Sequence, residues 1–209
     1  MSFPVKKVLY ADCTFHVWRE VYEPAEDSFL FAENLTVHGG ETVLDMGTGC
    51  GILGVIAARK ALRVVAVDIN PYAVRCAKEN AKLNDVADKM FFVQGDLFAP
   101  IKAEEKFDLI LFNAPYLPSE PSEGKTWVEQ AWTGGANGRA VIDCFLYGFS
   151  HYLKEDGRVL LMQSTLADVD KTLEILTMKG LKTRIVARRD FPLFESIVLI
   201  EAKYSFSKP

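Results

Sequence analysis

The segment best suited to chemistry is a glycine-rich turn at residues 45–54, Asp-Met-Gly-Thr-Gly-Cys-Gly-Ile-Leu-Gly. It follows a short apolar run and leads into an apolar, helix-like segment, Ile52–Ala58. Gly49, Gly51 and Gly54 have the spacing of a dinucleotide-binding fingerprint, in which glycines let the backbone approach a ligand closely. The turn therefore predicts a nucleotide-like ligand at the start of a helix.

Three acids narrow the choice of ligand. Asp45 stands directly before the glycines, where a pyrophosphate would meet a like charge, so a ligand with a cationic centre is favoured. Asp68 ends the next apolar run, at the usual distance for an acid that binds ribose hydroxyls. Asp96 and Leu97 follow the run after that, where they could bind an adenine amino group and pack on its ring. S-adenosylmethionine suits this set, although each acid alone could simply cap a helix.

A second motif, Asn113-Ala114-Pro115-Tyr116, ends the apolar run 107–112 and resembles the Asn-Pro-Pro-Tyr motif of methyltransferases that act on planar, weakly nucleophilic nitrogens. The lone pair of an amide nitrogen is delocalised, so a catalyst must hold both N–H groups and direct the remaining density at the methyl carbon. The side-chain carbonyl of Asn113 and the backbone carbonyl of Ala114 could accept those hydrogens while Tyr116 flanks the plane. The alternative is a turn in which Pro115 and Tyr116 only pack.

The elements that must position these motifs alternate between strands and helices. Short apolar runs predict seven buried strands, at 43–44, 64–67, 91–93, 109–112, 159–162, 185–186 and 197–200. Amphipathic or capped helical patterns lie between them, for example at 142–149 and after Asn70-Pro71. This alternation predicts an α/β fold with a mostly parallel sheet covered on both faces, and ligands beyond the carboxyl ends of the strands.

Two segments fall outside the alternation. In the first, up to about residue 35, Pro24 followed by Glu26 and Asp27 predicts the start of a helix. The second, 117–136, is rich in Pro, Gly, Ser and Glu and is predicted to be a loop on the substrate side. Because no linker interrupts the chain, we expect a single domain over 1–209, with 1–20 as an N-terminal extension.

Composition excludes several classes of protein. The 209 residues are 49% hydrophobic and 25% charged, and the net charge of −4 provides no global basic field for nucleic acid. The four cysteines are far apart, which predicts free thiols in a reducing compartment, and the scattered histidines predict no metal site. No apolar stretch approaches the roughly 20 residues that span a bilayer. We therefore expect a cytoplasmic protein without a metal or a membrane segment.

The chain resembles class I S-adenosylmethionine methyltransferases of the HemK type, and more narrowly the eukaryotic and archaeal branch that methylates class 1 translation release factors. The residues at 21–28, Val-Tyr-Glu-Pro-Ala-Glu-Asp-Ser, are similar to the opening signature of that branch, and those at 129–139 to its Ala-Trp-x-Gly-Gly-x-Asn-Gly-Arg segment. The resemblance covers 21–200 and, as in that branch, does not include the helical recognition domain of the bacterial enzymes.

The resemblance implies a Rossmann-like, seven-stranded sheet of order 3-2-1-4-5-7-6 and, as substrate, the glutamine in the Gly-Gly-Gln loop of a release factor. It implies that the glutamine amide binds at 113–116. The residues implied to bind the cofactor are Ser28, Asp45, Gly47, Gly49, Gly51, Asp68, Asp96, Leu97 and Asn113. Ala114 replaces the first proline of the family motif and no longer fixes the backbone torsion there. Alanine can adopt the same angles, so activity is expected, at an equal or lower rate.

Three other functions stay open. A methyltransferase that acts on amino groups of RNA or DNA would share both motifs, but the only basic cluster, at 179–189, lies away from them. A nicotinamide oxidoreductase is disfavoured by Asp45. A cofactor-binding scaffold without catalysis is suggested by Ala114.

The third predicted strand also suggests a partner. Met90, Phe91, Phe92 and Val93 place apolar groups on both of its faces, and the family topology makes it an edge. Several eukaryotic and archaeal enzymes of this branch use a small zinc-binding activator subunit that docks at this edge by strand addition, so the resemblance suggests such a partner. The alternative is a local cover by residues 99–105.

Overall fold

The computed structural model describes residues 5–120, 126–192 and 195–204. Its strands are β1 Val5–Tyr10, β2 Cys13–Trp18, β3 Thr42–Met46, β4 Arg63–Asp68, β5 Met90–Gln94, β6 Phe107–Asn113, β7 Leu153–Ser164, β8 Leu181–Asp190 and β9 Ser196–Tyr204. Its α-helices are α1 Glu26–Asn34, α2 Ile52–Ala58, α3 Pro71–Leu83, α4 Trp127–Gln130, α5 Ala140–Tyr152 and α6 Val169–Met178. Short 3-10 turns occupy Ala87–Lys89 and Thr165–Ala167.

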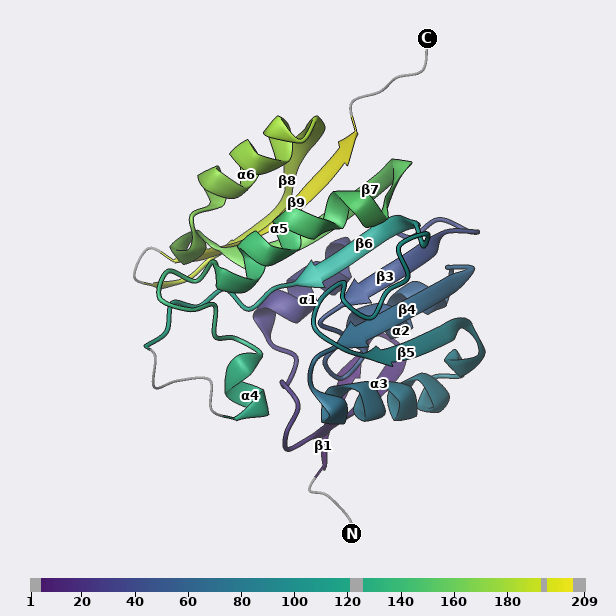
Figure 1. The fold of residues 1–209 in the computed structure, drawn as a ribbon. Helices are drawn as coiled ribbons and strands as arrows, with labels where there is room; N and C mark the ends of the chain where they lie inside the picture. Colours follow the sequence, from purple (N-terminus) through teal and green to yellow (C-terminus); the bar gives the residue numbers. More distant parts are fainter. Residues whose placement is uncertain (1–4, 121–125, 193–194, 205–209) are drawn as a thin grey trace.

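The central sheet has seven strands in the order β5-β4-β3-β6-β7-β9-β8 (Figure 1). Counted along the chain within this sheet, the order is 3-2-1-4-5-7-6, as the family resemblance implied. The strands from β3 to β7 pair in parallel, whereas β9 is antiparallel to both of its neighbours. The carboxyl ends of β3, β4, β5 and β6 therefore meet along one edge, where ligands of such sheets bind.

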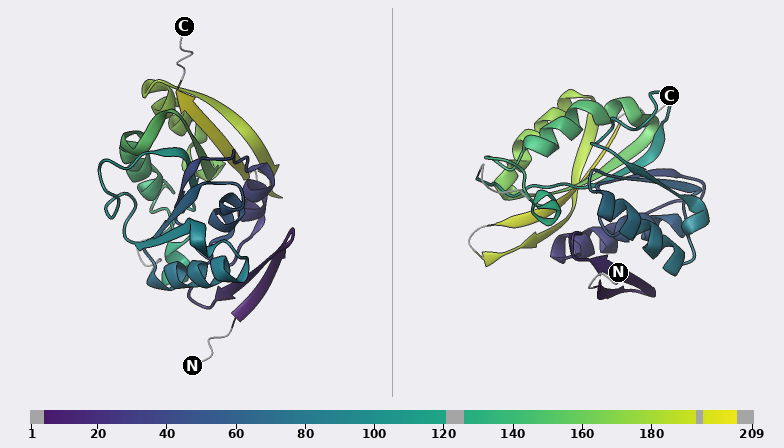
Figure 2. Two further views of the ribbon diagram at one scale, coloured as in Figure 1. Left: turned by 90° about the vertical axis from the view of Figure 1, so that its right-hand side faces the viewer. Right: turned by 60° about the horizontal axis from the view of Figure 1, so that its bottom comes forward.

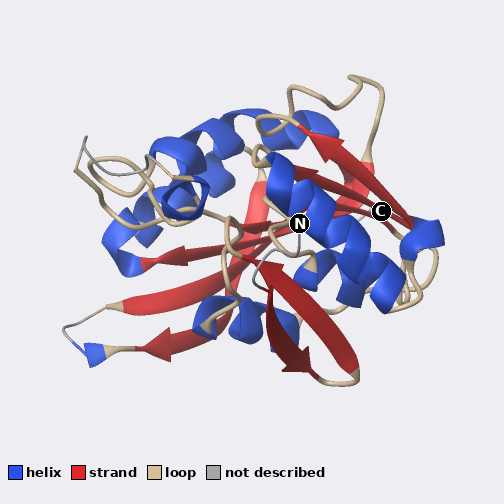
Figure 3. Ribbon diagram, turned by 90° about the horizontal axis from the view of Figure 1, so that it is seen from below, coloured by secondary structure: helices blue, strands red, loops and turns tan. Residues whose placement is uncertain are grey.

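Two apolar cores cover the two faces of the sheet, because successive strand residues point to opposite sides. One core lies with α1, α2 and α3 and includes Val43, Leu109, Leu111, Leu160, Met162, Ile197 and Leu199. The other lies with α5 and α6 and includes Leu44, Ile110, Phe112, Val159, Leu161, Val198 and Ile200. Figure 3 shows helices on either side of the strands. Burial on both faces explains why these strands are continuous apolar runs in the sequence.

The helices begin and end largely where the sequence indicates. Asn70 caps α3 by accepting a hydrogen bond from the backbone N–H of Tyr72, and Pro71 occupies the first turn. Gly180, with φ +82°, follows the end of α6. The longest helices have 13 residues. Among the described residues no helix is long and apolar enough to cross a membrane.

The N-terminal extension differs from the sequence-based expectation, which assigned no structure to it. Residues 5–18 form an antiparallel hairpin, β1–β2, that lies beside α3 (Figure 2). Asn80 of α3 and Asn84, which caps its C-terminal end, each bond both the N–H and the C=O of one β2 residue, His16 and Thr14 respectively, at 2.8–3.0 Å. Two helix side chains therefore satisfy the outer edge of β2 as a neighbouring strand would.

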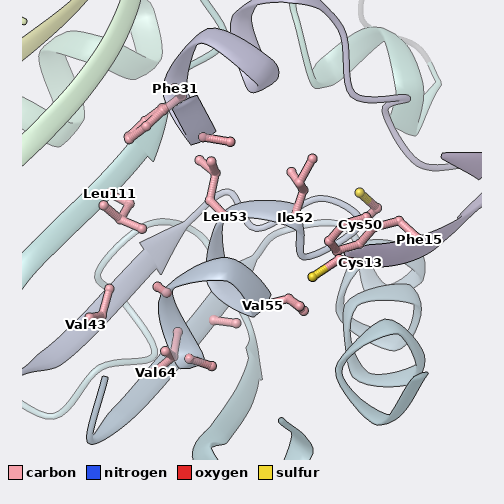
Figure 4. Packing of buried hydrophobic residues seen from close by; sticks show 14 of the residues in the cluster. Cys13, Phe15, Phe31, Val43, Cys50, Ile52, Leu53, Val55, Val64 and Leu111 are labelled. Carbon is pink, nitrogen blue, oxygen red and sulfur yellow. The ribbon is translucent and has the colours of Figure 1, made fainter. Parts of the chain in front are cut away.

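The hairpin contributes to the core as well as to the surface. Cys13, Phe15 and Val17 alternate inward along β2, and Figure 4 shows Cys13 and Phe15 in the same cluster as Cys50. All four cysteines are free thiols, as predicted, with Cys144 exposed and the others buried. Burial raises the pKa of the Cys76 thiol to about 11 and raises that of Cys50 further, so both stay protonated.

Candidate active site

A cavity of about 460 Å³ opens at the carboxyl edge of the sheet, between the glycine turn, the start of α1 and the segment after β6. Of the residues singled out in the sequence, those that line it are Ser28, Gly47, Gly49, Asp68, Asp96, Leu97 and all four residues of 113–116. Gly51 and Asp45 do not line it. Residues from five segments, remote in the sequence, thus share one cavity.

The glycine turn is shaped by backbone torsions that other residues rarely adopt. Gly47, Gly49 and Gly51 all have positive φ, between +56° and +88°. A Cβ on Gly51 would also lie 3.0 Å from the Cβ of Ala77 in α3. Gly51 thus permits close helix packing behind the turn, while Gly47 and Gly49 expose backbone to the cavity.

Asp68 joins the tip of β4 to this turn. Its Oδ2 accepts a hydrogen bond from the N–H of Gly49 at 2.8 Å, and its Oδ1 accepts one from the N–H of Asn70 at 2.9 Å. Burial raises the pKa of Asp68, while these backbone bonds oppose the rise. Each oxygen keeps a further lone pair, so the carboxylate can accept two ribose hydroxyls without losing its position.

Asp45 lies behind the turn, where the sequence had suggested direct contact with a cation. It is only 1% exposed, and its Oδ2 accepts a hydrogen bond from the hydroxyl of Thr48 at 2.6 Å. The N–H of Gly54 also bonds to it, and a Cβ on Gly54 would lie 2.7 Å from the carboxylate. Burial raises the pKa of Asp45 to about 7. Asp45 therefore holds the turn from behind and can act on a ligand through its charge.

The far end of the cavity is formed by a tight turn after β5. A Cβ on Gly95 would lie 2.6 Å from the ring of Pro100, so only glycine fits there. The turn holds Leu97 at φ +44°, a strained torsion for a branched side chain. Leu97 and the exposed Asp96 line the cavity, an apolar group beside an acceptor, which suits a purine with an amino group.

The opposite end is organised by a carboxylate that sequence reasoning did not select. Asp27, in the first turn of α1, is only 6% exposed. Its Oδ1 accepts hydrogen bonds from the backbone N–H of Ser28 at 2.6 Å, the Ser28 hydroxyl at 3.1 Å and the Tyr22 hydroxyl at 3.3 Å. Its Oδ2 accepts from Asn113 Nδ2 at 3.1 Å and the Tyr116 hydroxyl at 3.2 Å. We call these five residues the Asp27 cluster.

The Asp27 cluster fixes how Asn113 presents its amide. A carboxylate can only accept, so the NH₂ group of Asn113 must face Asp27. The Ser28 hydroxyl lies 3.4 Å from the same nitrogen. Asn113 Oδ1 is then left as a buried acceptor with no partner in the protein. Such an atom costs about 1–3 kcal/mol unless a donor reaches it, so it points to a ligand with an N–H or O–H group.

The two tyrosines of the cluster serve as neutral donors. Burial and the nearby charge of Asp27 raise the pKa of Tyr22 and of Tyr116 well above the ordinary value. Neither phenol ionises in the neutral range, so neither supplies a base. These neutral donors are suited to positioning an uncharged substrate group rather than to removing its proton.

The segment after the motif is held by a second loop. Leu117 exchanges backbone hydrogen bonds with Trp132 and Gly134 at 2.9 and 2.8 Å. Gly138 fits against the carbonyl of Tyr116, because a Cβ on Gly138 would lie 2.3 Å from that oxygen. Residues 121–125 of the predicted 117–136 loop lie outside the described residues, and α4 occupies part of the rest.

Sequence reasoning thus missed Asp27, Tyr22 and Thr48 as members of the site. The signal for Asp27 was its place directly before Ser28, a residue already selected, in the 21–28 signature. The signal for Thr48 was its place between two glycines of the turn.

Comparisons with known proteins agree with this geometry. Residues 28–114 match the family model of ribosomal protein L11 methyltransferases. The matched stretch begins at Ser28, contains the glycine turn, Asp68 and Asp96, and ends at Ala114. It therefore covers the glycine turn and the ends of β4 and β5, and it stops inside the 113–116 motif.

Two relatives match this chain over most of their length and of its own. A putative protein N5-glutamine methyltransferase of Methanocaldococcus jannaschii is 45% identical over 185 residues, which cover 88% of this chain and 91% of that protein. The human methyltransferase HEMK2 is 35% identical, over 78% of this chain and 80% of that protein.

A solved structure also has a similar fold. The E. cuniculi Mtq2-Trm112 complex, described as responsible for methylation of the eRF1 translation termination factor, matches 89% of this chain and 99% of its own with a TM-score of 0.69 and 26% identity. The two relatives and this solved structure agree with this chain over most of its length. The chain therefore belongs to the family of protein N5-glutamine methyltransferases that includes HEMK2, and its cofactor is S-adenosylmethionine.

Proposed function

We propose that this enzyme methylates the side-chain amide of the glutamine in the Gly-Gly-Gln loop of a class 1 translation release factor. The observation that carries the proposal is Asn113 Oδ1, a buried acceptor without a partner at the end of the cavity opposite Asp96. Two descriptions support the proposal: the archaeal relative is named a putative protein N5-glutamine methyltransferase, and the E. cuniculi complex is described as responsible for methylation of the eRF1 translation termination factor. A release factor acts where proteins are made, so the proposal places the enzyme in the cytoplasm.

The residues at 113–116 would act by positioning. Asn113 Oδ1 would accept one N–H of the glutamine amide, the Ala114 carbonyl would accept the other, and Tyr116 would flank the plane. Bound S-adenosylmethionine supplies an electrophilic methyl carbon on a sulfonium. Holding both hydrogens aims the nitrogen at that carbon. Such placement can lower the activation free energy by several kcal/mol.

The cofactor would be held by the other end of the cavity. Asp68 would take the ribose hydroxyls, Asp96 and Leu97 the adenine, and Ser28 with Gly47 the methionine part. Asp45 would contribute from behind the turn, because its negative charge favours a cationic ligand.

Methylation of a nucleic-acid amino group shares this chemistry but has less support. Arg184, Arg188 and Arg189 of the basic cluster on β8 each pair with an acid, Glu201, Asp190 and Glu33 respectively. Paired arginines attract a phosphate backbone less strongly than free ones.

The test is transfer from labelled S-adenosylmethionine to a purified release factor. We expect label in the wild-type factor and none in a factor whose Gly-Gly-Gln glutamine is replaced by asparagine, because the shorter side chain withdraws the nitrogen. Total RNA is incubated in parallel at low salt. Label in RNA but not in the release factor would overturn the proposal.

We further infer that a small zinc-binding activator subunit pairs with the edge strand β5. β5 stands at the end of the sheet, with β4 as its described neighbour, and Phe91 is 54% exposed on it. Phe92 is half-buried against the first core. Residues 99–105, the alternative local cover, form turns, bends and irregular segments and leave Phe91 exposed. An exposed aromatic on an open edge favours a partner that adds a strand.

Phe91→Asp tests this partner better than Phe92→Asp, because Phe92 also packs in the core. We expect Phe91→Asp to keep the fold but lose co-purification with a co-expressed zinc-binding subunit. Met178→Asp, which changes an even more exposed apolar side chain on α6, should retain it. A wild-type protein that is well behaved and fully active alone would contradict the partner.

A further inference from the structure

Asp27 accepts five hydrogen bonds, from residues at or just before the start of its own helix and from the 113–116 motif. All four of its partners line the cavity, and two of them, Asn113 at the end of β6 and Tyr116 after it, lie 86 and 89 residues away in the sequence. The others are local, namely Ser28 and Tyr22. One buried carboxylate thus links the start of α1 to the motif that faces the acceptor.

The two oxygens of Asp27 have separate tasks. Oδ1 is committed to the helix, because the 2.6 Å bond from the backbone N–H of Ser28 is fixed by the first turn. Oδ2 is left for Asn113 and Tyr116. The orientation of the Asn113 amide therefore depends on Oδ2 being an acceptor.

We propose that Asp27 is the positioning residue that fixes which end of the Asn113 amide faces the substrate nitrogen. With a carboxylate at position 27, the NH₂ of Asn113 turns inward and Oδ1 turns to the substrate. The inference rests on the proposed function for its substrate, an amide that offers N–H groups, but the orientation is a property of the free enzyme. Asp27 does not touch the reacting atoms.

An isosteric change isolates this role. In Asp27→Asn the side-chain oxygen stays with the fixed N–H of Ser28, so the new NH₂ takes the place of Oδ2 and faces the NH₂ of Asn113. Two donors cannot bond, so the amide of Asn113 turns over and presents its NH₂ to the substrate amide. We expect kcat to fall on the order of 100-fold, the loss associated with a misplaced reacting group, while the Kd for S-adenosylmethionine stays within threefold.

In the Asn113→Asp background, the effect of Asp27→Asn on activity should reverse. In Asn113→Asp two carboxylates face each other with no donor between them, and activity is low. Adding Asp27→Asn supplies that donor, and the second oxygen of position 113 is again free to accept from the substrate. Asp27→Asn should therefore lower activity in the wild-type background and raise it at least fivefold in the Asn113→Asp background. A carboxylate that only stabilises the fold predicts a loss in both backgrounds.

The experiment measures kcat, KM for the release factor, Kd for S-adenosylmethionine and melting temperature for the four proteins of this cycle. Asp108→Asn is the matched control, since Asp108 lies at the other end of β6 and bonds Thr42 and Lys154 outside the cavity. It should keep full activity. A reversal of sign supports the proposal. Activity of Asp27→Asn within threefold of wild type, or a double variant no more active than Asn113→Asp, overturns it. If Asp27→Asn alone does not fold, the comparison within the Asn113→Asp background decides.

Failure of the proposed substrate is recognised separately, because the wild type would then not label the release factor. The orientation is in that case decided by the side-chain NH₂ signals of Asn113 in ¹⁵N NMR of the free enzyme, assigned by their absence in Asn113→Asp. We expect one proton protected from exchange in the wild type and unprotected in Asp27→Asn. Equal protection in both proteins overturns the proposal.

Discussion

The two ends of the cavity differ in whether backbone or side-chain groups form them. At the end to which we assign the cofactor, here called the cofactor end, the backbone forms most of the site. The turn depends on positive torsions at Gly47, Gly49 and Gly51, and Asp68 is fixed by two backbone N–H groups. At the end to which we assign the substrate amide, here called the acceptor end, side chains bond to side chains, and Asp27 accepts a hydrogen bond from Asn113. The first end should therefore be sensitive to added volume and strain, and the second to the exchange of a donor for an acceptor.

The largest expected effect is at the acceptor end. Asn113→Ala removes the acceptor that aims the substrate nitrogen, so methyl transfer should fall by at least about 10³-fold. Affinity for S-adenosylmethionine should change little. Labelled transfer and calorimetry measure the two quantities, and turnover within a few-fold of wild type would mean that 113–116 is not the catalytic site.

At the cofactor end, Asp68→Ala should weaken S-adenosylmethionine binding by about 100-fold or more. It removes the acceptor for two hydroxyls and also the partner of Gly49 in the turn. Calorimetry gives the Kd directly. Near-wild-type affinity would show that Asp68 does not bind the ribose.

Two glycine substitutions compare the cost of a steric clash with the cost of a strained backbone torsion. Gly138→Ala places a Cβ 2.3 Å from the Tyr116 carbonyl, so it should lower the free energy of unfolding by about 3 kcal/mol and reduce kcat. Gly49→Ala meets no atom within 4 Å and carries only the strain of φ +56°, about 1 kcal/mol. Denaturant unfolding measures both, and equal losses would contradict the geometry.

The charge of Asp45 predicts a smaller effect that depends on pH. Its pKa of about 7 lies above the ordinary value, so the free protein holds a proton at pH 6 that a cationic ligand displaces. Affinity for S-adenosylmethionine should therefore rise from pH 6 to pH 8, by about tenfold for each unit of pKa that the cation removes.

The same raised pKa means that the free energy of unfolding should fall as pH rises from about 4 to about 7 and level off above, because only the folded state holds the proton in that range. In Asp45→Asn both dependences should flatten. Calorimetry in buffers of different ionisation enthalpy detects the released proton, and no release at pH 6 would exclude this role.

The smallest effect is expected for Ala114→Pro, which restores the first proline of the family motif. The N–H of Ala114 makes one long bond, 3.4 Å to the carbonyl of Met162, so its loss costs little. The rate of methyl transfer should be unchanged or up to about threefold higher. A large loss would show that this chain depends on that bond.

Local patterns made most of the fold predictable. The inner strands β3, β6, β7 and β9 are largely buried on both faces and appear as apolar runs, whereas the edge strands β5 and β8 are partly exposed. Asn70-Pro71 marks the start of α3. The strand order followed from the family resemblance. The hairpin β1–β2 was not predicted, because its inward set is only Cys13, Phe15 and Val17 and its outer edge is satisfied by asparagines of a distant helix.

By itself, the sequence determined the glycine turn, the acids at the strand ends and the 113–116 motif, because each depends on neighbouring residues and on the rule that parallel strands end at one edge. Only the tertiary structure decided that Asp45 lies behind the turn and that Asp27 meets Asn113. The direction of a side chain depends on packing between elements far apart in the chain, here the first turn of α1 against the end of β6, and no local pattern encodes that contact.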